Sequence, residues 1–426
     1  MKPEPKIGRN IMDQIVADGA ERIDAHRKAD LTVRVTDPAG RPVSGARVRI
    51  EQRRHDFRFG CILFESVEGS ADKDNEARRF LDVFNYTTLP FYWGSYEPRQ
   101  GEERRAELEA IARWCERHGV ATKGHPLVWF EVNPEWAKTL EDPIRWNEER
   151  VKRIMRDFSG RPGAHGQYRP GLVECWDVIN EATVADRHDN AFRAWFHRVG
   201  PTEMTRQALL WAREANPHAT LLVNDYNLGP AYEELLGQVV PEGLCDGLGI
   251  QSHMQSGEWP LEKVWSACET YGRFGVPVHF TELSVVSGAY KPRDSDWYNS
   301  IPDWTSTPEG EARQAEYLES FFRLLFSHPA VEAVTYWGFR DPLWLNSPGG
   351  LLRADGSPKP SYEALRRLVR EEWWTDASGA TGGDGAFTSR IFAGEHDVTV
   401  TAAGRRTTAT VAVPRRSAME VSVCVS

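Results

Sequence analysis

Short apolar runs alternate with amphipathic stretches along the middle of this chain. Each run has the length of a buried strand, and several of the stretches between them place apolar residues three or four positions apart, as a helix does. In residues 104–118, for example, Leu108, Ile111 and Cys115 fall on one face. The runs are residues 59–64, 83–89, 121–128, 173–179, 220–224, 247–251, 277–281 and 331–337.

Eight apolar strands separated by helices predict an α/β protein built on a (β/α)8 TIM barrel. The alternative is an open, doubly wound sheet, which would lead us to expect a glycine-rich phosphate loop after the first strand. Residues 61–65 contain no glycine, so the barrel is favoured. In a barrel, polar residues at the carboxyl ends of the strands build the active site.

Both ends of the chain have a different hydrophobic pattern from the middle. Residues 31–35 and 46–50, and later 396–401 and 407–413, alternate apolar with polar residues, as half-buried strands do. Two or three short strands are too few to be stable alone, so we expect the two ends to combine into one small β-sandwich. The pattern from Val35 to Val48 resembles the opening strands of immunoglobulin-like, prealbumin-like sandwich modules.

The predicted organisation therefore has four parts. These are an N-terminal helix at residues 1–30, the first part of the β-sandwich at 31–56, the barrel at 57–375 and the second part of the sandwich at 376–426.

Charge and composition exclude several classes of partner. The 426 residues include 52 basic and 62 acidic side chains, which give a net charge of −10. Nucleic acids and anionic membranes both require clustered positive charge, so neither is an expected partner. The six cysteines lack zinc-ligand spacing, and we expect no metal and no cofactor.

The chain also lacks an apolar run long enough for a membrane span and lacks a signal-peptide core near Met1. We therefore expect a cytoplasmic protein, or a secreted one whose leader has been removed.

The 16 tryptophans fill a large core or line a groove for a flat ligand such as a sugar. The oligomeric state stays open.

Two glutamates stand where apolar strands run out into the predicted barrel mouth. Glu181 ends the fourth strand, and Glu282 ends the seventh. Each alone would be read as a helix cap or an ion-pair partner. Two at equivalent strand ends, three strands apart, instead favour a pair of carboxylates that act as acid, base or nucleophile on an acetal.

The residues around these glutamates carry a family resemblance. Residues 176–181, Trp-Asp-Val-Ile-Asn-Glu, closely resemble the acid/base motif of glycoside hydrolase family 10, the β-1,4-xylanase family, and residues 281–283, Thr-Glu-Leu, are similar to its nucleophile motif. Four further segments follow in the family's order at the ends of other strands: residues 124–129, 224–227, 250–253 and 336–338.

The resemblance implies a retaining β-glycosidase that works by double displacement on a carbohydrate substrate. It assigns Glu282 as the nucleophile and Glu181 as the acid/base, with Asn180 contacting the sugar 2-hydroxyl and His253 beside the nucleophile. Several other side chains are expected to bind the substrate, although each has packing as its alternative. They are His125, Trp129, Gln251, Tyr226, Tyr92, Trp337 and Trp344.

The sequence departs from the family pattern on its second strand. The family usually has Glu-Asn-x-Met-Lys-Trp there, whereas this chain has Thr88, Leu89 and Tyr92 in place of the glutamate, asparagine and lysine. Ser284 replaces the usual aspartate after Thr-Glu-Leu, and Phe130 replaces a histidine. Because hydrogen bonds to hydroxyls discriminate strongly between sugars, these changes predict an altered glycone subsite.

Two other functions compete with this prediction. One is a catalytically silent carbohydrate-binding protein with the same groove, although binding alone does not require both glutamates. The other is a metal-dependent barrel hydrolase, which would require paired histidines that the sequence does not place at any strand end.

Overall fold

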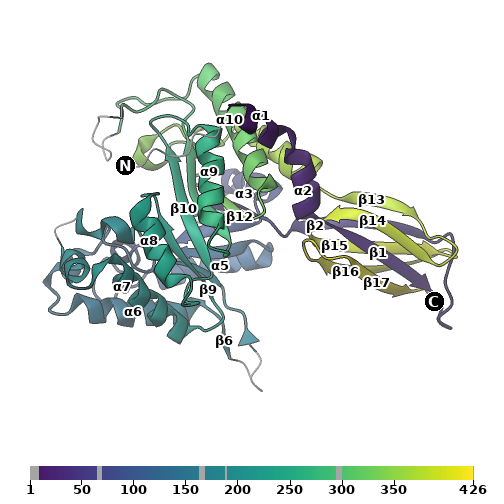
Figure 1. Ribbon diagram of the computed structural model, residues 1–426, viewed down its shortest axis with the longest axis horizontal. Helices are drawn as coiled ribbons and strands as arrows, with labels where there is room; N and C mark the ends of the chain where they lie inside the picture. Colours follow the sequence, from purple (N-terminus) through teal and green to yellow (C-terminus); the bar gives the residue numbers. More distant parts are fainter. Residues whose placement is uncertain (1–8, 65–69, 163–167, 188–189, 294–299, 426) are drawn as a thin grey trace. The chain divides into compact units, whose positions relative to one another are not determined.

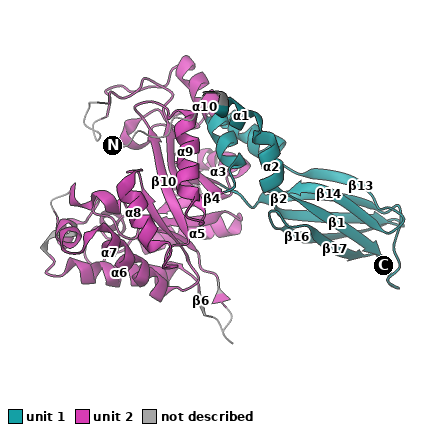
Figure 2. Ribbon diagram, viewed as in Figure 1, with its two compact units in different colours: residues 1–58, 318–329, 362–426 teal, residues 59–317, 330–361 magenta. Residues whose placement is uncertain are grey.

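A computed structural model describes residues 9–64, 70–162, 168–187, 190–293 and 300–425 of the chain (Figure 1). These residues form two compact units (Figure 2). One unit comprises residues 1–58, 318–329 and 362–426, and the other comprises residues 59–317 and 330–361. Among the described helices, none is both long enough and apolar enough to cross a bilayer.

The larger unit, magenta in Figure 2, is organised around a closed barrel of parallel strands, which confirms the predicted (β/α)8 fold. Around the barrel the order is β10-β11-β12-β3-β4-β5-β8-β9, so strands that follow one another along the chain are neighbours in space. The strands are β3 (Arg58–Ile62), β4 (Tyr86–Pro90), β5 (Ala121–His125), β8 (Cys175–Asn180), β9 (Thr220–Asp225), β10 (Gly247–Met254), β11 (Val278–Val285) and β12 (Val331–Tyr336).

Helices follow the barrel strands and bury one face each. The face predicted for residues 104–118 is the buried face of α5, since Leu108, Ile111 and Cys115 are all inaccessible. At the start of α6, the Asp142 side chain accepts a hydrogen bond from the Arg145 N–H, which caps the helix. The helices are α3 (Ala71–Val83), α4 (Trp93–Tyr96), α5 (Arg105–Arg117), α6 (Pro143–Phe158), α7 (Ala191–Ala215), α8 (Pro230–Val239), α9 (Leu261–Gly272), α10 (Pro308–Ser327) and α11 (Pro360–Arg367).

Strands from both ends of the chain make two sheets, ordered β14-β1-β17 and β13-β2-β15-β16. Every strand of the N-terminal pair lies between or beside C-terminal strands, as the sandwich prediction requires. Alternate residues of β1 and β2 meet those of β15 in one apolar core, which includes Val33, Ile50 and Val400. The strands are β1 (Lys28–Thr36), β2 (Arg47–His55), β13 (Asp376–Ala380), β14 (Ala386–Phe392), β15 (Gly394–Ala402), β16 (Arg405–Val413) and β17 (Met419–Cys424).

Some element boundaries differ from the sequence expectation. The helical stretch at the N-terminus is two helices, α1 (Arg9–Ala17) and α2 (Gly19–Arg27), and β1 already begins at Lys28. Residues 28–30 are extended because they pair with residues 390–392 of β14, a partner that local sequence does not reveal. A short hairpin, β6 (Arg161–Pro162) and β7 (Tyr168–Arg169), stands outside the barrel sheet.

Candidate active site

The candidate catalytic residues lie at the carboxyl ends of neighbouring barrel strands. Asn180 is the last residue of β8 and Glu181 follows it, while Glu282 lies in the last half of β11. Gln251 and His253 lie in the same part of β10. Since the carboxyl ends of parallel barrel strands meet at one face, residues distant in sequence converge here.

Asn224, at the end of β9, connects the two glutamate regions. Its Nδ2 donates to Glu282 Oε1 at 2.7 Å and to Asn180 Oδ1 at 2.8 Å, and its Oδ1 accepts from Thr281 Oγ1 at 2.6 Å. The amide has room because residue 249 on the adjacent strand is glycine, where a Cβ atom would stand 2.2 Å from Asn224 Oδ1. This buried amide therefore fixes where the Glu282 carboxylate points.

Glu181 is buried among neutral amides. Its Oε1 accepts hydrogen bonds from Gln251 Nε2 at 2.9 Å and Asn180 Nδ2 at 3.1 Å. Burial raises the pKa of Glu181 to about 8, with further contributions from the Glu282 and Asp225 charges, although the Gln251 hydrogen bond opposes the rise. The carboxyl group is therefore protonated at neutral pH and able to act as an acid.

The backbone at Glu181 has a φ of 59°, in the left-handed region that a residue with a Cβ atom rarely adopts. Its N–H donates to Asn224 O at 2.8 Å. Two residues further on, Thr183 donates through Oγ1 to Asp225 Oδ2 at 2.9 Å. These bonds hold the turn that carries the acid.

Glu282 has an opposite electrostatic environment. Its Oε2 lies 3.0 Å from His253 Nε2, and its Oε1 lies 3.8 Å from His125 Nε2. Burial alone would raise the pKa of Glu282, but the attraction of His125, the His253 hydrogen bond and the Lys123 charge together lower it below its ordinary value. The carboxylate is therefore ionised at neutral pH.

A buried ion pair supports the imidazole of His125. Asp177 accepts from Lys123 Nζ at 2.5 Å and lies 2.7 Å from His125 Nδ1. Burial would raise the pKa of Asp177, but Lys123 and His125 together lower it. An ionised Asp177 takes the Nδ1–H of His125 and so fixes the ring with Nε2 towards Glu282.

Aromatic rings surround this polar centre. The Tyr92 ring lies 5.3 Å from that of His125 and 5.5 Å from that of Trp129, and Trp337 lies 5.2 Å from His125. Trp344 is 38% exposed, and its ring lies 4.9 Å from that of His253. Tyr226 is 39% exposed, and its ring contacts Arg187.

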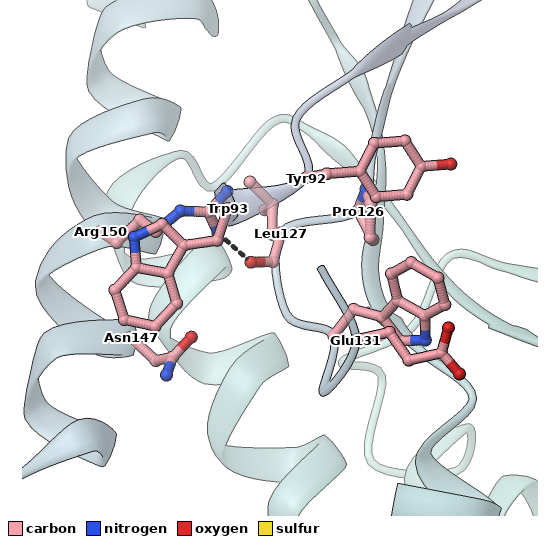
Figure 3. Close-up of a pocket in the computed structure, with 8 residues that line it drawn as sticks. Tyr92, Trp93, Pro126, Leu127, Glu131, Asn147 and Arg150 are labelled. Carbon is pink, nitrogen blue, oxygen red and sulfur yellow. Dashed lines mark hydrogen bonds between the residues drawn. The ribbon is translucent and has the colours of Figure 1, made fainter. Parts of the chain in front are cut away.

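A small pocket lies beside Tyr92 and Trp129 (Figure 3). The buried Arg150 reaches from α6 and donates to the backbone carbonyls of Phe91 and Leu127, which belong to the segments after β4 and β5. Burial lowers the pKa of Arg150 to about 10, so the guanidinium stays charged at neutral pH. The Arg150 side chain therefore joins the two segments that carry Tyr92 and Trp129.

The second-strand substitutions differ in exposure. Thr88 and Leu89 are fully buried in β4, whereas Tyr92 is half-buried beside His125. Of these three residues, Tyr92 has ring contacts with His125 and Trp129.

Similarity to known proteins shows the family of this chain. A sequence model described as "Glycosyl hydrolase family 10" matches residues 54–368. The chain belongs to glycosyl hydrolase family 10. The predicted membership of this family is therefore confirmed.

Relatives of this family 10 hydrolase are moderately similar. Endo-1,4-beta-xylanase B of Thermotoga neapolitana is 27% identical over 317 residues, which cover 70% of this chain and 85% of the xylanase. The anti-sigma-I factor RsgI6 of Acetivibrio thermocellus is 27% identical over 418 residues, which cover 94% of this chain but 48% of that protein. Xylanase 10B of Thermotoga petrophila, solved with xylobiose, shares the fold, with a TM-score of 0.60, 22% identity, and coverage of 74% of this chain and 95% of that one.

Sequence reasoning about this hydrolase missed residues that act through others. Lys123, Asp177 and Asn224 lie inside the matched motifs or next to them, yet none was singled out. Each of them contacts residues of other strands, and the sequence of a single strand does not reveal those partners. Within the described residues, no group of three or more His, Cys, Asp or Glu side chains is arranged to hold a metal ion.

Proposed function

We propose that this family 10 hydrolase cleaves a β-linked glycoside with retention of configuration, using Glu282 as the nucleophile and Glu181 as the acid/base. The observation that carries the proposal is the opposite surroundings of two buried carboxyl groups in one site: amides hold Glu181, whereas imidazoles face Glu282. The pKa of Glu181 is raised to about 8, while that of Glu282 is lowered. Environments that push two pKa values apart in this way are typical of an acid and a nucleophile.

In the first step, a Glu282 carboxylate oxygen attacks the anomeric carbon, and the bond from that carbon to the leaving oxygen breaks. Glu181 gives its proton to the leaving oxygen. In the second step, the Glu181 carboxylate takes a proton from water, whose oxygen attacks the same carbon and displaces Glu282. Each glutamate ends in its starting protonation state.

The neighbouring residues support these steps. Asn224 and His253 hold the two oxygens of Glu282 before attack. Gln251 and Asn180 hold Glu181, and Asn180 is placed for the sugar 2-hydroxyl contact, which strengthens in the transition state. His125, Trp129, Trp337 and Trp344 are the proposed sugar-contacting side chains around the mouth.

The glycone side is proposed to differ from that of the xylanases. At Tyr92 the site has a phenol packed on His125 and Trp129, where the family pattern has a lysine. An aromatic ring favours an apolar sugar face and offers no positive charge. Xylan and xylo-oligosaccharides remain the first substrates to test because xylanases are prominent among the relatives.

A panel of aryl β-xylosides, aryl β-cellobiosides, xylo-oligosaccharides and xylan tests the proposal. We expect turnover of at least one member, release of the β-anomer first in proton NMR, and loss of turnover in Glu282→Gln. Release of the α-anomer would contradict the retaining mechanism. A Tyr92→Lys variant that gains activity on xylo-oligosaccharides relative to aryl glycosides would support the altered glycone side, and an unchanged ratio would contradict it.

The silent carbohydrate-binding protein is the competing outcome of the same panel. It predicts no turnover of any member, with oligosaccharide binding that survives Glu282→Gln. The different protonation of the two glutamates argues against it, because binding alone does not require an acid and a carboxylate in one site.

A further inference from the structure

His253 has a hydrogen-bond partner at each ring nitrogen, and one of them is Ser284, which stands where the family pattern has an aspartate. Nε2 lies 3.0 Å from Glu282 Oε2, and Nδ1 lies 2.9 Å from Ser284 Oγ. Ser284 is itself buried, and its Oγ receives a hydrogen bond from Gln255 Nε2 at 3.0 Å. A chain of four side chains thus runs from Gln255 to Glu282.

The hydrogens in this chain can be assigned from what each group is able to donate. The ionised Glu282 carboxylate only accepts, so His253 Nε2 must carry a hydrogen. At the other end, the Gln255 amide nitrogen only donates, so Ser284 Oγ accepts that hydrogen. The serine hydroxyl then has one hydrogen of its own to place, and His253 Nδ1 is its one acceptor among the described residues.

We infer that Ser284 and Gln255 hold His253 as a neutral imidazole with its hydrogen on Nε2, so that an uncharged donor binds the Glu282 carboxylate. This rests on the proposed function in one respect, the role of Glu282 as the nucleophile. Ser284 acts here as a positioning residue, because it touches the histidine and not the reacting atoms.

An imidazolium at residue 253 would break the chain of donors. Its Nδ1–H would have to donate to Ser284, which already accepts from Gln255, and the serine hydrogen would be left in a buried place without an acceptor. Unsatisfied buried hydroxyl groups are costly. An aspartate at position 284, the residue of the family pattern, would have the opposite effect, because a carboxylate accepts from Nδ1–H and favours the charged ring.

The charged groups around this chain are few. Glu282 is the ionisable group in hydrogen-bond contact with the His253 ring, and the indoles of Trp337 and Trp344 pack beside that ring. Glu282 in turn faces His125, Lys123, Tyr92 and Glu181 from the other strands. Changing residue 284 therefore alters the charge of one imidazole next to the nucleophile.

Nitrogen-15 NMR of the histidine rings in the full-length protein tests the inference directly. The His253 signals are assigned by their absence in His253→Asn. At neutral pH we expect one protonated ring nitrogen, Nε2, in the unaltered protein and in the matched control Ser284→Thr, which keeps the hydroxyl group. In Ser284→Asp both nitrogens should carry hydrogen.

Two outcomes would overturn the inference. They are an imidazolium in the unaltered protein, as the opposite orientation of the Gln255 amide would produce, or a ring with its hydrogen on Nδ1. If Ser284→Asp does not fold, Gln255→Glu provides the second variant: its carboxylate accepts the serine hydrogen, so Ser284 Oγ can accept from Nδ1–H with no hydrogen left unpaired, and the imidazolium fraction should rise. No such rise would contradict the role of Gln255.

A kinetic measurement separates this inference from the proposed function. In Ser284→Asp the imidazolium contacts Glu282 directly, whereas the new carboxylate lies on the other side of the His253 ring. The positive charge should therefore dominate and move the acid limb of kcat/KM to lower pH by about one pH unit, while Ser284→Thr leaves it in place. If no glycoside is turned over but the Nε2–H ring is observed, the proposed function fails and the assignment of His253 stands. If turnover is normal and both nitrogens are protonated in the unaltered protein, the assignment fails alone.

Discussion

Glu181 and Glu282 are the same residue type at nearly the same burial, with 7% and 5% of their surface exposed. Their pKa values nevertheless move in opposite directions. Desolvation acts on both in the same sense, so the neighbours make the difference. Glu181 has two amides and the charges of other carboxylates around it, whereas Glu282 has two imidazoles and a lysine. In this site the surrounding residues, and not the depth of burial, determine which carboxyl group is the acid.

The largest expected effect comes from Glu282→Gln. Removing the nucleophile should lower kcat by about 10⁴-fold or more. The same change removes a negative charge near Glu181, so the pKa of Glu181 should fall, but only in part, because burial is its main cause. Infrared or NMR titration of the Glu181 carboxyl group measures this, and a pKa that stays at about 8 would show that the Glu282 charge plays no part in the difference.

Glu181→Gln should have a smaller effect that depends on the leaving group. General acid catalysis contributes about 10²–10⁴-fold, so unactivated glycosides should lose activity in that range. Aryl glycosides with a very acidic phenol need no proton at the first step and should lose far less in the rate of that step. The alkaline limb of kcat/KM near pH 8 in the unaltered enzyme should disappear. Equal losses on both substrate types would contradict the acid role.

Lys123→Met tests whether positive charge near Glu282 lowers the pKa of that carboxyl group. The variant leaves Asp177 buried without its cation, which should lower the free energy of unfolding by about 3–5 kcal/mol. Without the lysine charge the pKa of Glu282 should rise, so activity should be lost at a higher pH on the acid side.

The stability effect of Lys123→Met should also depend on pH. The folded-state pKa of Asp177 is lowered, so its stabilising contribution is present at neutral pH and is lost as the pH falls through that lowered value. The difference in unfolding free energy between variant and parent, measured with denaturant, should shrink accordingly. Lys123→Arg, which keeps the charge, is the matched control. If the acid limb of the pH profile stays in place in Lys123→Met, the Lys123 charge does not contribute to the lowered pKa of Glu282.

The smallest expected effect comes from Asp225→Asn. Burial raises the pKa of Asp225 to about 6, so it is ionised at the alkaline limb, where its charge disfavours ionisation of Glu181. Removing that charge should move the alkaline limb of kcat/KM to lower pH by a fraction of a pH unit. Thr183→Val keeps the Asp225 charge but loses the Thr183 hydroxyl hydrogen bond, and it should leave the limb in place. A limb that moves in Thr183→Val but not in Asp225→Asn would assign the effect to the turn geometry.

The barrel could be predicted from sequence because its strands are almost wholly buried and several of them, such as β9 and β12, appear as nearly continuous apolar runs. The strand ends were harder. Both β10 and β11 extend to Met254 and Val285, beyond the expected residues 251 and 281, because the polar residues of the site interrupt the apolar run while the backbone pairing continues. At the N-terminus, residues 28–30 were expected to be helical, since nothing local indicates their pairing with β14.

The site residues that belong to sequence motifs could be predicted, whereas those whose role depends on contacts between strands could not. Glu181 and Glu282 stand at recognisable strand ends. Lys123 was not predicted, because a lysine in a short strand ordinarily faces solvent, and only the closed barrel places it against Asp177. The contacts of the Tyr92 ring with His125 and Trp129 likewise depend on the closed barrel, which brings the segments after β4 and β5 together.

The sandwich sheets impose an order of events on synthesis. Thr32 and Thr388 face each other although 356 residues separate them in sequence. At a translation rate of about 5–20 residues per second, β1 waits roughly 20–70 s for the strands that cover it. During that time its open edges and apolar face are exposed on the ribosome, so the first strands to be made are among the last to find their partners and are the segment on which chaperones would act.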